Sequence, residues 1–142
     1  MLIGQYEGKV GEKHQAALPK KFREELGEKL IITKGFEKCL IIVSEENWKT
    51  LLEGTEGKPF TSKNTRELQR FLLGNATYIE LDSKGRFVLP EYLRRFAKLR
   101  EDVTFVGIQR FVEMWDKKMW DDHQEELSGK IESIAERLSG EE

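Results

Sequence analysis

The feature that most constrains the fold of this 142-residue chain is an internal duplication. At an offset of 71 or 72 residues, uncommon residues in the first half align with the same or similar residues in the second half. The aligned pairs are Pro19 with Pro90, Arg23 with Arg94, Gly35 with Gly107, Ser44 with Asp116 and Trp48 with Trp120. Proline, glycine and tryptophan rarely coincide by chance, so the pattern favours a true structural repeat.

Each copy predicts the same order of elements: a strand, a polar turn, a second strand, a helix beginning at proline, a β-hairpin and a capped helix. Proline is expected in the first turn of its helix, where its missing N–H costs nothing. Gly35 and Gly107 are expected to form the hairpin turns. Ser44 and Asp116 are expected to cap the helices that carry the aligned tryptophans. The predicted ranges are Gln5–Val10, Ala16–Leu18, Pro19–Leu26, Leu30–Thr33 and Cys39–Val43, then Thr77–Leu81, Phe87–Leu89, Pro90–Ala97, Val103–Val106 and Phe111–Trp115.

These elements predict an α+β fold, mainly β with helices, in which two pseudo-symmetric β-α-β-β-α units form one small barrel of interlocked halves. We expect a single domain with repeats at about 4–53 and 75–125, joined by a linker and helix over 54–74. Within that junction, Thr65–Leu73 is expected to be helical, with Gly74 ending the helix.

The C-terminal segment after Trp120 is predicted to be an acidic helix. Its apolar residues are spaced by four, three and four positions, as on one face of a helix. They are Leu127, Ile131, Ile134 and Leu138, and Gly129 interrupts the pattern. This stripe packs either against its own domain or against a neighbouring subunit.

Charge is distributed unevenly along the chain. Residues 1–100 contain 19 Lys and Arg against 14 Asp and Glu, a net of +5, whereas residues 101–142 contain 5 against 12, a net of −7. A basic body is compatible with nucleic-acid binding but also with an ordinary solvated surface. No apolar run is long enough for a membrane span and no signal peptide is evident, so the expected location is the cytoplasm.

Catalytic residues are poorly represented. His14 lies in a polar turn, and Cys39 lies in a predicted buried strand, where a small hydrophobe is expected rather than a nucleophile. His123 lies beside Asp121, Asp122 and Glu126, a possible metal cluster that is more typical of a solvated helix face. The chain carries no glycine-rich phosphate-binding motif. We therefore expect no enzyme, cofactor, metal site or small-molecule substrate.

The most informative segment is the polar turn Asp82-Ser-Lys-Gly-Arg86 before Phe87-Val-Leu-Pro90. Asp82 can accept backbone N–H groups and stiffen the turn, and Gly85 offers a left-handed position at low cost. Lys84 and Arg86 then project from a rigid frame that suits phosphate or guanine contact. A plain Asp82–Arg86 ion pair is the alternative, and both can hold together.

Further basic residues follow each turn. They are Lys20, Lys21 and Arg23 in the first copy and Arg94, Arg95 and Lys98 in the second. The secondary DNA contacts expected are Lys13 and Gln15 of the first turn together with Lys20, Lys21, Arg94 and Arg95.

This combination resembles the MraZ family of bacterial transcriptional regulators, which has an AbrB-like swapped-hairpin fold. The resemblance rests on the duplicated unit, on Asp-x-x-x-Arg before an apolar-Leu-Pro segment, and on Leu68-Gln-Arg-Phe-Leu-Leu-Gly-Asn-Ala76. It implies a cytoplasmic, nucleoid-associated protein that binds double-stranded DNA as a ring-shaped homo-oligomer. It also implies contact with tandem repeats in the promoter of the division and cell-wall gene cluster.

The first copy departs from the family pattern, which usually has Asp-x-x-x-Arg twice. Gly11 stands where Asp is expected, His14 where Gly is expected and Gln15 where Arg is expected. Gln15 lacks a charge for phosphate, and His14 is expected to resist a left-handed turn.

The sequence therefore predicts a DNA-binding regulator, most simply a repressor, with Arg86 and Lys84 as primary contacts and Asp82 and Gly85 shaping the loop. One rival hypothesis is an assembly protein of the same architecture with little DNA affinity. The other is a hydrolase that uses His123 and the carboxylates near it.

Overall fold

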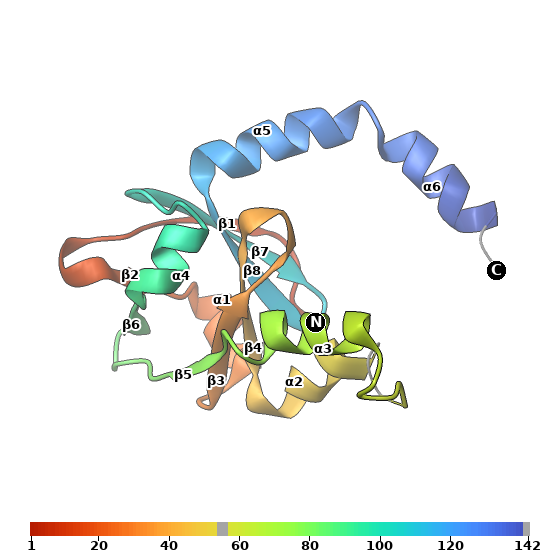
Figure 1. Cartoon of the computed structure of the whole chain (residues 1–142). Helices are drawn as coiled ribbons and strands as arrows, with labels where there is room; N and C mark the ends of the chain where they lie inside the picture. The colour runs from red at the N-terminus through yellow and green to blue at the C-terminus, as the bar shows by residue number, and fades with distance from the viewer. Residues whose placement is uncertain (54–56, 141–142) are drawn as a thin grey trace.

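The structure is a computed structural model that describes residues 1–53 and 57–140. The first copy contains β1 (Gln5–Lys9), η1 (Glu12–His14), β2 (Gln15–Ala17), α1 (Lys20–Leu26), β3 (Leu30–Lys34), η2 (Phe36–Lys38), β4 (Leu40–Ser44) and α2 (Glu45–Leu52). After α3 (Lys63–Leu72), the second copy contains β5 (Thr77–Ile79), β6 (Arg86–Val88), α4 (Glu91–Phe96), β7 (Asp102–Ile108), β8 (Phe111–Asp116) and α5 (Lys117–Ser128), and α6 (Ile131–Gly140) follows (Figure 1).

Among the described residues, the strands form two antiparallel sheets. The larger has the order β1-β7-β8-β4-β3-β5 and the smaller pairs β2 with β6. Each copy therefore gives its first strand to the hairpin of the other copy, because β1 pairs with β7 and β5 with β3. The α+β class and the interlocked copies are confirmed. The sheet has two ends in this order, so its hydrogen-bonded strands do not close into the expected barrel.

The strand registers show that the copies are related by a pseudo-two-fold axis. In the small sheet Ala16 lies opposite Phe87, its own counterpart at an offset of 71. In the large sheet Ile41 lies opposite Glu113, its counterpart at an offset of 72. The axis therefore passes through the centres of both sheets. The division into repeats at about 4–53 and 75–125 stays a prediction.

One hydrophobic core lies between the two sheets and helices α1 and α4. Equivalent leucines on either side of the prolines, Leu18 and Leu89, are buried within it. The prolines themselves lie at the N-cap positions of α1 and α4, one residue before the first helical turn where the sequence analysis placed them. Their extended ψ of 138° explains this, because the chain is still leaving the strand at that point.

The predicted helix caps are confirmed. Ser44 Oγ accepts a hydrogen bond from the Asn47 amide at 3.0 Å at the start of α2. At the equivalent position of α5, the Asp116 carboxylate accepts one from the Met119 amide at 3.3 Å. The two hairpins thus pass into their helices by the same local chemistry.

The hairpin turns correct one expectation. Gly35 does begin the β3–β4 turn, but Gly107 lies inside β7, opposite Val112. A Cβ on Gly107 would lie 2.5 Å from the Ile3 nitrogen, so glycine is required there for the close approach of the N-terminal segment. The turn itself is made at Gln109, whose φ is 62°. Cys39 is fully buried as expected, and burial raises the pKa of its thiol.

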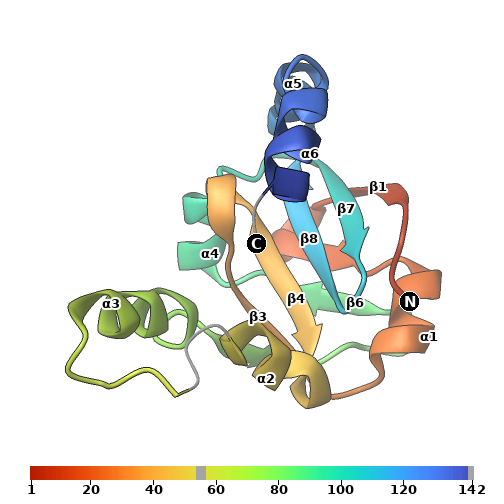
Figure 2. The same cartoon turned by 90° about the vertical axis from the view of Figure 1, so that its right-hand side faces the viewer.

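The two helical additions differ in how they pack. Helix α3 (Lys63–Leu72) begins slightly before the predicted start at Thr65, with Ser62 as its cap, and it buries Leu72. Residues 54–56 of the expected linker lie outside the described residues. The C-terminal helix is broken after Ser128 into α5 and α6, which form an arm leading away from the body (Figures 1 and 2). Neither arm helix has a buried residue, so packing of the stripe on its own domain was wrong for the described residues.

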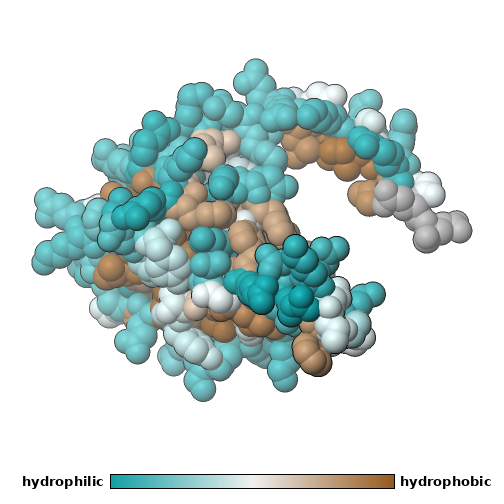
Figure 3. All heavy atoms as spheres, viewed as in Figure 1, coloured by the Kyte–Doolittle hydropathy of each residue, from teal (hydrophilic) through white to brown (hydrophobic). Residues whose placement is uncertain are grey.

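The apolar stripe of the arm is not covered by the rest of the described chain. Ile131 is 47% exposed and Leu138 is 63% exposed. Figure 3 shows hydrophobic residues gathered on the concave side of the arm, across a gap from the body.

Candidate nucleic-acid interface

The β2–β6 ribbon and its two flanking loops form one edge of the molecule, at the left of Figure 1 and far from α6. Side chains alternate along both strands: Ala16 and Phe87 enter the core, while their neighbours face outward. The outward residues are Gln15, Ala17, Arg86 and Val88, with Gln15 opposite Val88 and Ala17 opposite Arg86. The ribbon therefore presents a narrow two-stranded surface with one arginine and one glutamine related by the pseudo-two-fold axis.

The loop before β6 is held by one carboxylate. Asp82 Oδ1 accepts hydrogen bonds from the amides of Lys84 and Arg86, both at 2.9 Å. Its Oδ2 accepts a third from Arg86 Nε at 2.7 Å. Gly85, at a φ of 78°, makes the left-handed step that brings the chain back to the ribbon. The predicted stiffening by Asp82 and the ion-pair alternative therefore hold together.

The same bonds set the electrostatics of this loop. The Arg86 amide and guanidinium hydrogen-bond the carboxylate and lower the pKa of Asp82 below its usual range, although desolvation opposes them. The Arg86 side chain nevertheless stays 46% exposed. Only its Nε is hydrogen-bonded within residues 1–53 and 57–140, so both terminal nitrogens remain for a partner. The loop therefore holds an oriented guanidinium at the surface.

The loop before β2 has the same backbone bonds without the same side chains. Gly11 donates to the Gln15 carbonyl at 2.8 Å and His14 donates to the Gly11 carbonyl at 3.2 Å, as Asp82 and Gly85 do in the second loop. His14 was expected to resist a left-handed conformation, but it adopts a φ of 58° and Lys13 a φ of 60°. The backbone pairing of both strands imposes this conformation despite its cost.

The other basic residues lie around this edge in different states. Lys84 and Lys13 are exposed in the two loops, and Lys20 and Lys21 are exposed at the start of α1. Arg95 donates from Nη2 to Glu91 Oε1 at 2.6 Å on the surface of α4. Arg94 is half-buried, and its Nε is buried with no hydrogen-bond partner in the described part of the chain. Arg94 is thus less accessible than a simple surface contact requires.

Two outward residues of the ribbon, Ala17 and Val88, were not predicted from the sequence. Val88 is 56% exposed although it lies in an apolar run. The available signal was the alternation of Arg86, Phe87 and Val88, since neighbours of a buried strand residue face the other way.

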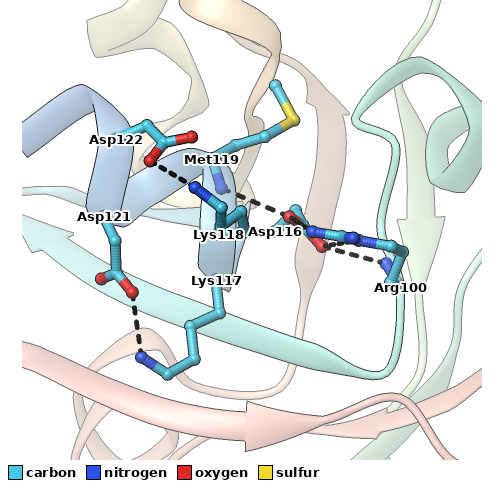
Figure 4. A network of polar contacts seen from close by, with 7 residues as sticks. All are labelled: Arg100, Asp116, Lys117, Lys118, Met119, Asp121 and Asp122. Atoms are coloured by element: carbon cyan, nitrogen blue, oxygen red, sulfur yellow. Dashed lines mark hydrogen bonds and ion pairs between the residues drawn. The ribbon is translucent and has the colours of Figure 1, made fainter.

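The acidic helix does not assemble the cluster that a hydrolase would need. Asp121 pairs with Lys117 and Asp122 with Lys118, each four residues apart on the helix (Figure 4). Glu126 pairs with Lys130 at the same spacing. The His123 ring instead packs against the indole of Trp115, with 4.9 Å between centroids. Across residues 1–53 and 57–140, no three potential ligands are grouped to hold a metal ion.

The polar network around Asp116 has a structural role. Asp116, buried at the start of α5, accepts bonds from Arg100 Nη2 at 3.0 Å, from the Arg100 amide and Nε, and from the Met119 amide (Figure 4). Desolvation raises the pKa of Asp116, but these hydrogen bonds outweigh it and leave the pKa below its usual value. The network fastens the junction of β8 and α5 to Arg100, in the connection between α4 and β7.

The duplicated, interlocked architecture agrees with sequence comparison. The profile of the family described as "MraZ protein, putative antitoxin-like" matches the chain twice, over residues 1–71 and 72–141. The chain belongs to the MraZ family.

Members of the MraZ family match along almost the whole chain. A protein of Caldanaerobacter subterraneus subsp. tengcongensis is 41% identical over 138 residues, which cover 97% of this chain and 96% of the relative. A protein of Acetivibrio thermocellus is 40% identical over 139 residues, covering 98% and 97%, and one of Moorella thermoacetica is 36% identical over 138 residues, covering 97% and 96%. All three carry the name "Transcriptional regulator MraZ". In the described part of this chain, no helix is both long and apolar enough to cross a membrane.

Proposed function

We propose that this chain is a sequence-specific DNA-binding transcriptional regulator that reads DNA with the β2–β6 ribbon. The observation that carries the proposal is the Asp82–Arg86 pair. Asp82 Oδ2 accepts from Arg86 Nε at 2.7 Å, which fixes the guanidinium while leaving its outer edge free. An arginine oriented in this way suits the two acceptors of a guanine edge.

The two-stranded shape of the ribbon supports its proposed role in reading DNA. The major groove of DNA admits a two-stranded β-ribbon as well as a helix. Arg86 and Gln15 lie at symmetric positions of the outward face, so both can approach base edges from one ribbon. Lys84 and Lys13 in the loops lie beside them and suit phosphate contacts.

The secondary contacts are proposed further from the ribbon. Lys20 and Lys21 at the start of α1 are exposed and free to approach the backbone of DNA. Arg95 would leave its partner Glu91 to bind phosphate. Arg94 would act mainly by supporting the loop beside it. We propose a binding role rather than a catalytic one, without cofactor or small-molecule substrate.

The target and the location are proposed from the resemblance to the family. The relatives are named transcriptional regulators, which supports the same activity here. We propose repression at repeats in the promoter of the division and cell-wall gene cluster, by a cytoplasmic protein associated with the nucleoid.

We also propose that the working form is a ring-shaped homo-oligomer. One subunit offers only a few phosphate contacts, and linked subunits that engage tandem repeats together gain affinity without new contacts. The uncovered stripe on α6 supports an assembly larger than one chain.

The salt dependence of binding tests this function. Fluorescence anisotropy would compare a labelled duplex from upstream of the chain's own gene with a scrambled duplex of equal length. The proposal expects tighter binding to the upstream duplex and an affinity that falls steeply between about 50 and 200 mM salt. Equal, weak binding to both duplexes would contradict it.

A second candidate is an oligomeric assembly protein with little DNA affinity. The first loop favours it, because Gly11 and Gln15 give that loop neither carboxylate nor guanidinium. An intact ring with no measurable preference for upstream DNA would support this candidate.

A further inference from the structure

Arg23 of the first copy lies directly on the DNA-binding loop proposed for the second copy. A Cβ built on Gly85 would lie 2.3 Å from Nη1 of Arg23, 2.4 Å from its Cδ and 2.5 Å from its Cζ. These separations are far below van der Waals contact, so the arginine occupies the space that any side chain at position 85 would need. Gly85 is therefore required for the approach of Arg23 as well as for its own backbone conformation.

The backbone binds the same two segments together. The Leu18 amide, just before α1, donates to the Gly85 carbonyl at 2.9 Å. The Gly85 amide donates to the Asp82 carbonyl, also at 2.9 Å. The first copy thus holds Gly85 through a hydrogen bond and a packed side chain, one residue before the arginine that the loop presents.

The position of Arg23 carries a cost in free energy. Its Nε is buried without a hydrogen-bond partner in the described residues, and the same is true of Arg94, its counterpart in α4. A buried donor left unpaired costs free energy. Its occurrence at two symmetric positions, each beside a loop, points to a role in shaping the loops.

We propose that Arg23 is a positioning residue that clamps the Asp82–Arg86 loop from the other copy and keeps Arg86 aimed outward. The part that concerns DNA rests on the proposed function, whereas the effect on loop shape does not. The first loop has a looser counterpart, because His14 carries the Cβ that Gly85 lacks. Arg94 there lines an open hollow together with Gly11, Glu12 and His14.

A double-mutant cycle on Arg23 and Gly85 tests the clamp. The readout is amide hydrogen exchange at Lys84 and Arg86, whose N–H groups both donate to Asp82. Arg23→Ala and Gly85→Ala should each speed this exchange about tenfold. The double variant should be no worse than Gly85→Ala alone, because the steric conflict is then gone.

Two matched variants separate the clamp from a general loss of stability. Arg94→Ala removes the symmetric arginine and should leave exchange at Lys84 and Arg86 unchanged. Arg23→Lys keeps the aliphatic stem and should restore part of the protection. Exchange at Phe105, in the core, should stay constant in all variants.

The outcomes are distinct. The clamp would be overturned if Arg23→Ala left exchange at Lys84 and Arg86 within twofold of the parent. Strict additivity in the cycle would also overturn it, as would an equal acceleration of exchange at Phe105. If the exchange responds as expected but the parent does not bind upstream DNA, the clamp stands and the proposed function fails. If both hold, Arg23→Ala should weaken DNA binding towards the level of Arg86→Ala.

Discussion

The first loop offers the most direct way to engineer the proposed site. Gly11→Asp, His14→Gly and Gln15→Arg together would give it the residues of the second loop. Both loops already share their backbone hydrogen bonds. Gly11 has an extended backbone, with φ −90° and ψ −162°, and a Cβ there would meet only the Gln15 carbonyl oxygen, at 3.9 Å. The new aspartate can therefore take the place that Asp82 has in the other copy.

The change in the free energy of unfolding is the sum of the contributions of the individual substitutions. A left-handed residue other than glycine costs about 1–2 kcal/mol, which His14→Gly removes. The added freedom of glycine in the unfolded chain costs about 0.4–1 kcal/mol, and Gly11→Asp recovers a similar amount. The triple variant should therefore unfold with a free energy about 1–2 kcal/mol higher than the parent, measured by urea denaturation.

The effect on DNA binding should be larger. A new bidentate arginine–guanine contact contributes about 1–3 kcal/mol, or about 5- to 150-fold in affinity per site. The new guanidinium should steepen the plot of log affinity against log salt by at most about 0.9, because the new aspartate beside it carries the opposite charge. Anisotropy titrations at several salt concentrations measure both, with Gln15→Arg alone as the control that lacks the orienting carboxylate. A triple variant that is folded but binds no more tightly, with the same slope, would show that an oriented arginine in this loop does not contact DNA.

Three further results are expected. Asp116→Ala should lower the free energy of unfolding by about 1 kcal/mol through loss of the α5 cap and further through loss of the Arg100 hydrogen bonds, whereas Asp116→Ser should restore the cap alone, as Ser44 does in α2; thermal unfolding of both variants checks this. Because the folded-state pKa of Asp116 is lowered, its ionised form stabilises the fold above the unfolded-state pKa of about 3.9, and this contribution should disappear as the pH falls through the folded-state pKa. Unfolding midpoints measured between about pH 6 and pH 2.5 should therefore lose less stability on acidification in Asp116→Ser than in the parent. An equal loss in both proteins would contradict the lowered pKa of Asp116. Ile131→Asp should reduce the oligomer in light scattering while Ser133→Asp should not, and an unchanged assembly in both would exclude α6 from the interface.

Local features of the fold were predictable because they depend on nearby residues. Ser44 and Asp116 cap helices with their own side chains, and the turn at Asp82 is closed by residues within four positions. The exchange of β1 and β5 between copies was harder to specify, because partner choice depends on packing between segments far apart in sequence. Gly107 shows the same difficulty: its reason for being glycine is the distant N-terminal segment at Ile3.

The contacts of the candidate site were likewise predictable where they are local and not where they join distant segments. The sequence predicted that Asp82 would orient Arg86, and the structure confirms that bond. It could not predict that Arg23 packs on Gly85, since that contact joins the two copies through the tertiary fold. It also predicted the wrong behaviour for His14, because strand pairing outweighs the backbone preference of one residue.

The proposed function depends above all on contact between Arg86 and DNA. The direct measurement is the affinity of Arg86→Ala for a duplex from upstream of its own gene, beside Gln15→Ala and a control, Arg110→Ala, at the distant β7–β8 turn. Arg86→Ala should lose about 1–3 kcal/mol per site, Gln15→Ala less, and Arg110→Ala almost nothing, with fold and oligomeric state unchanged. If Arg86→Ala binds as tightly as the parent, the Asp82–Arg86 pair is structural and the proposed function is wrong.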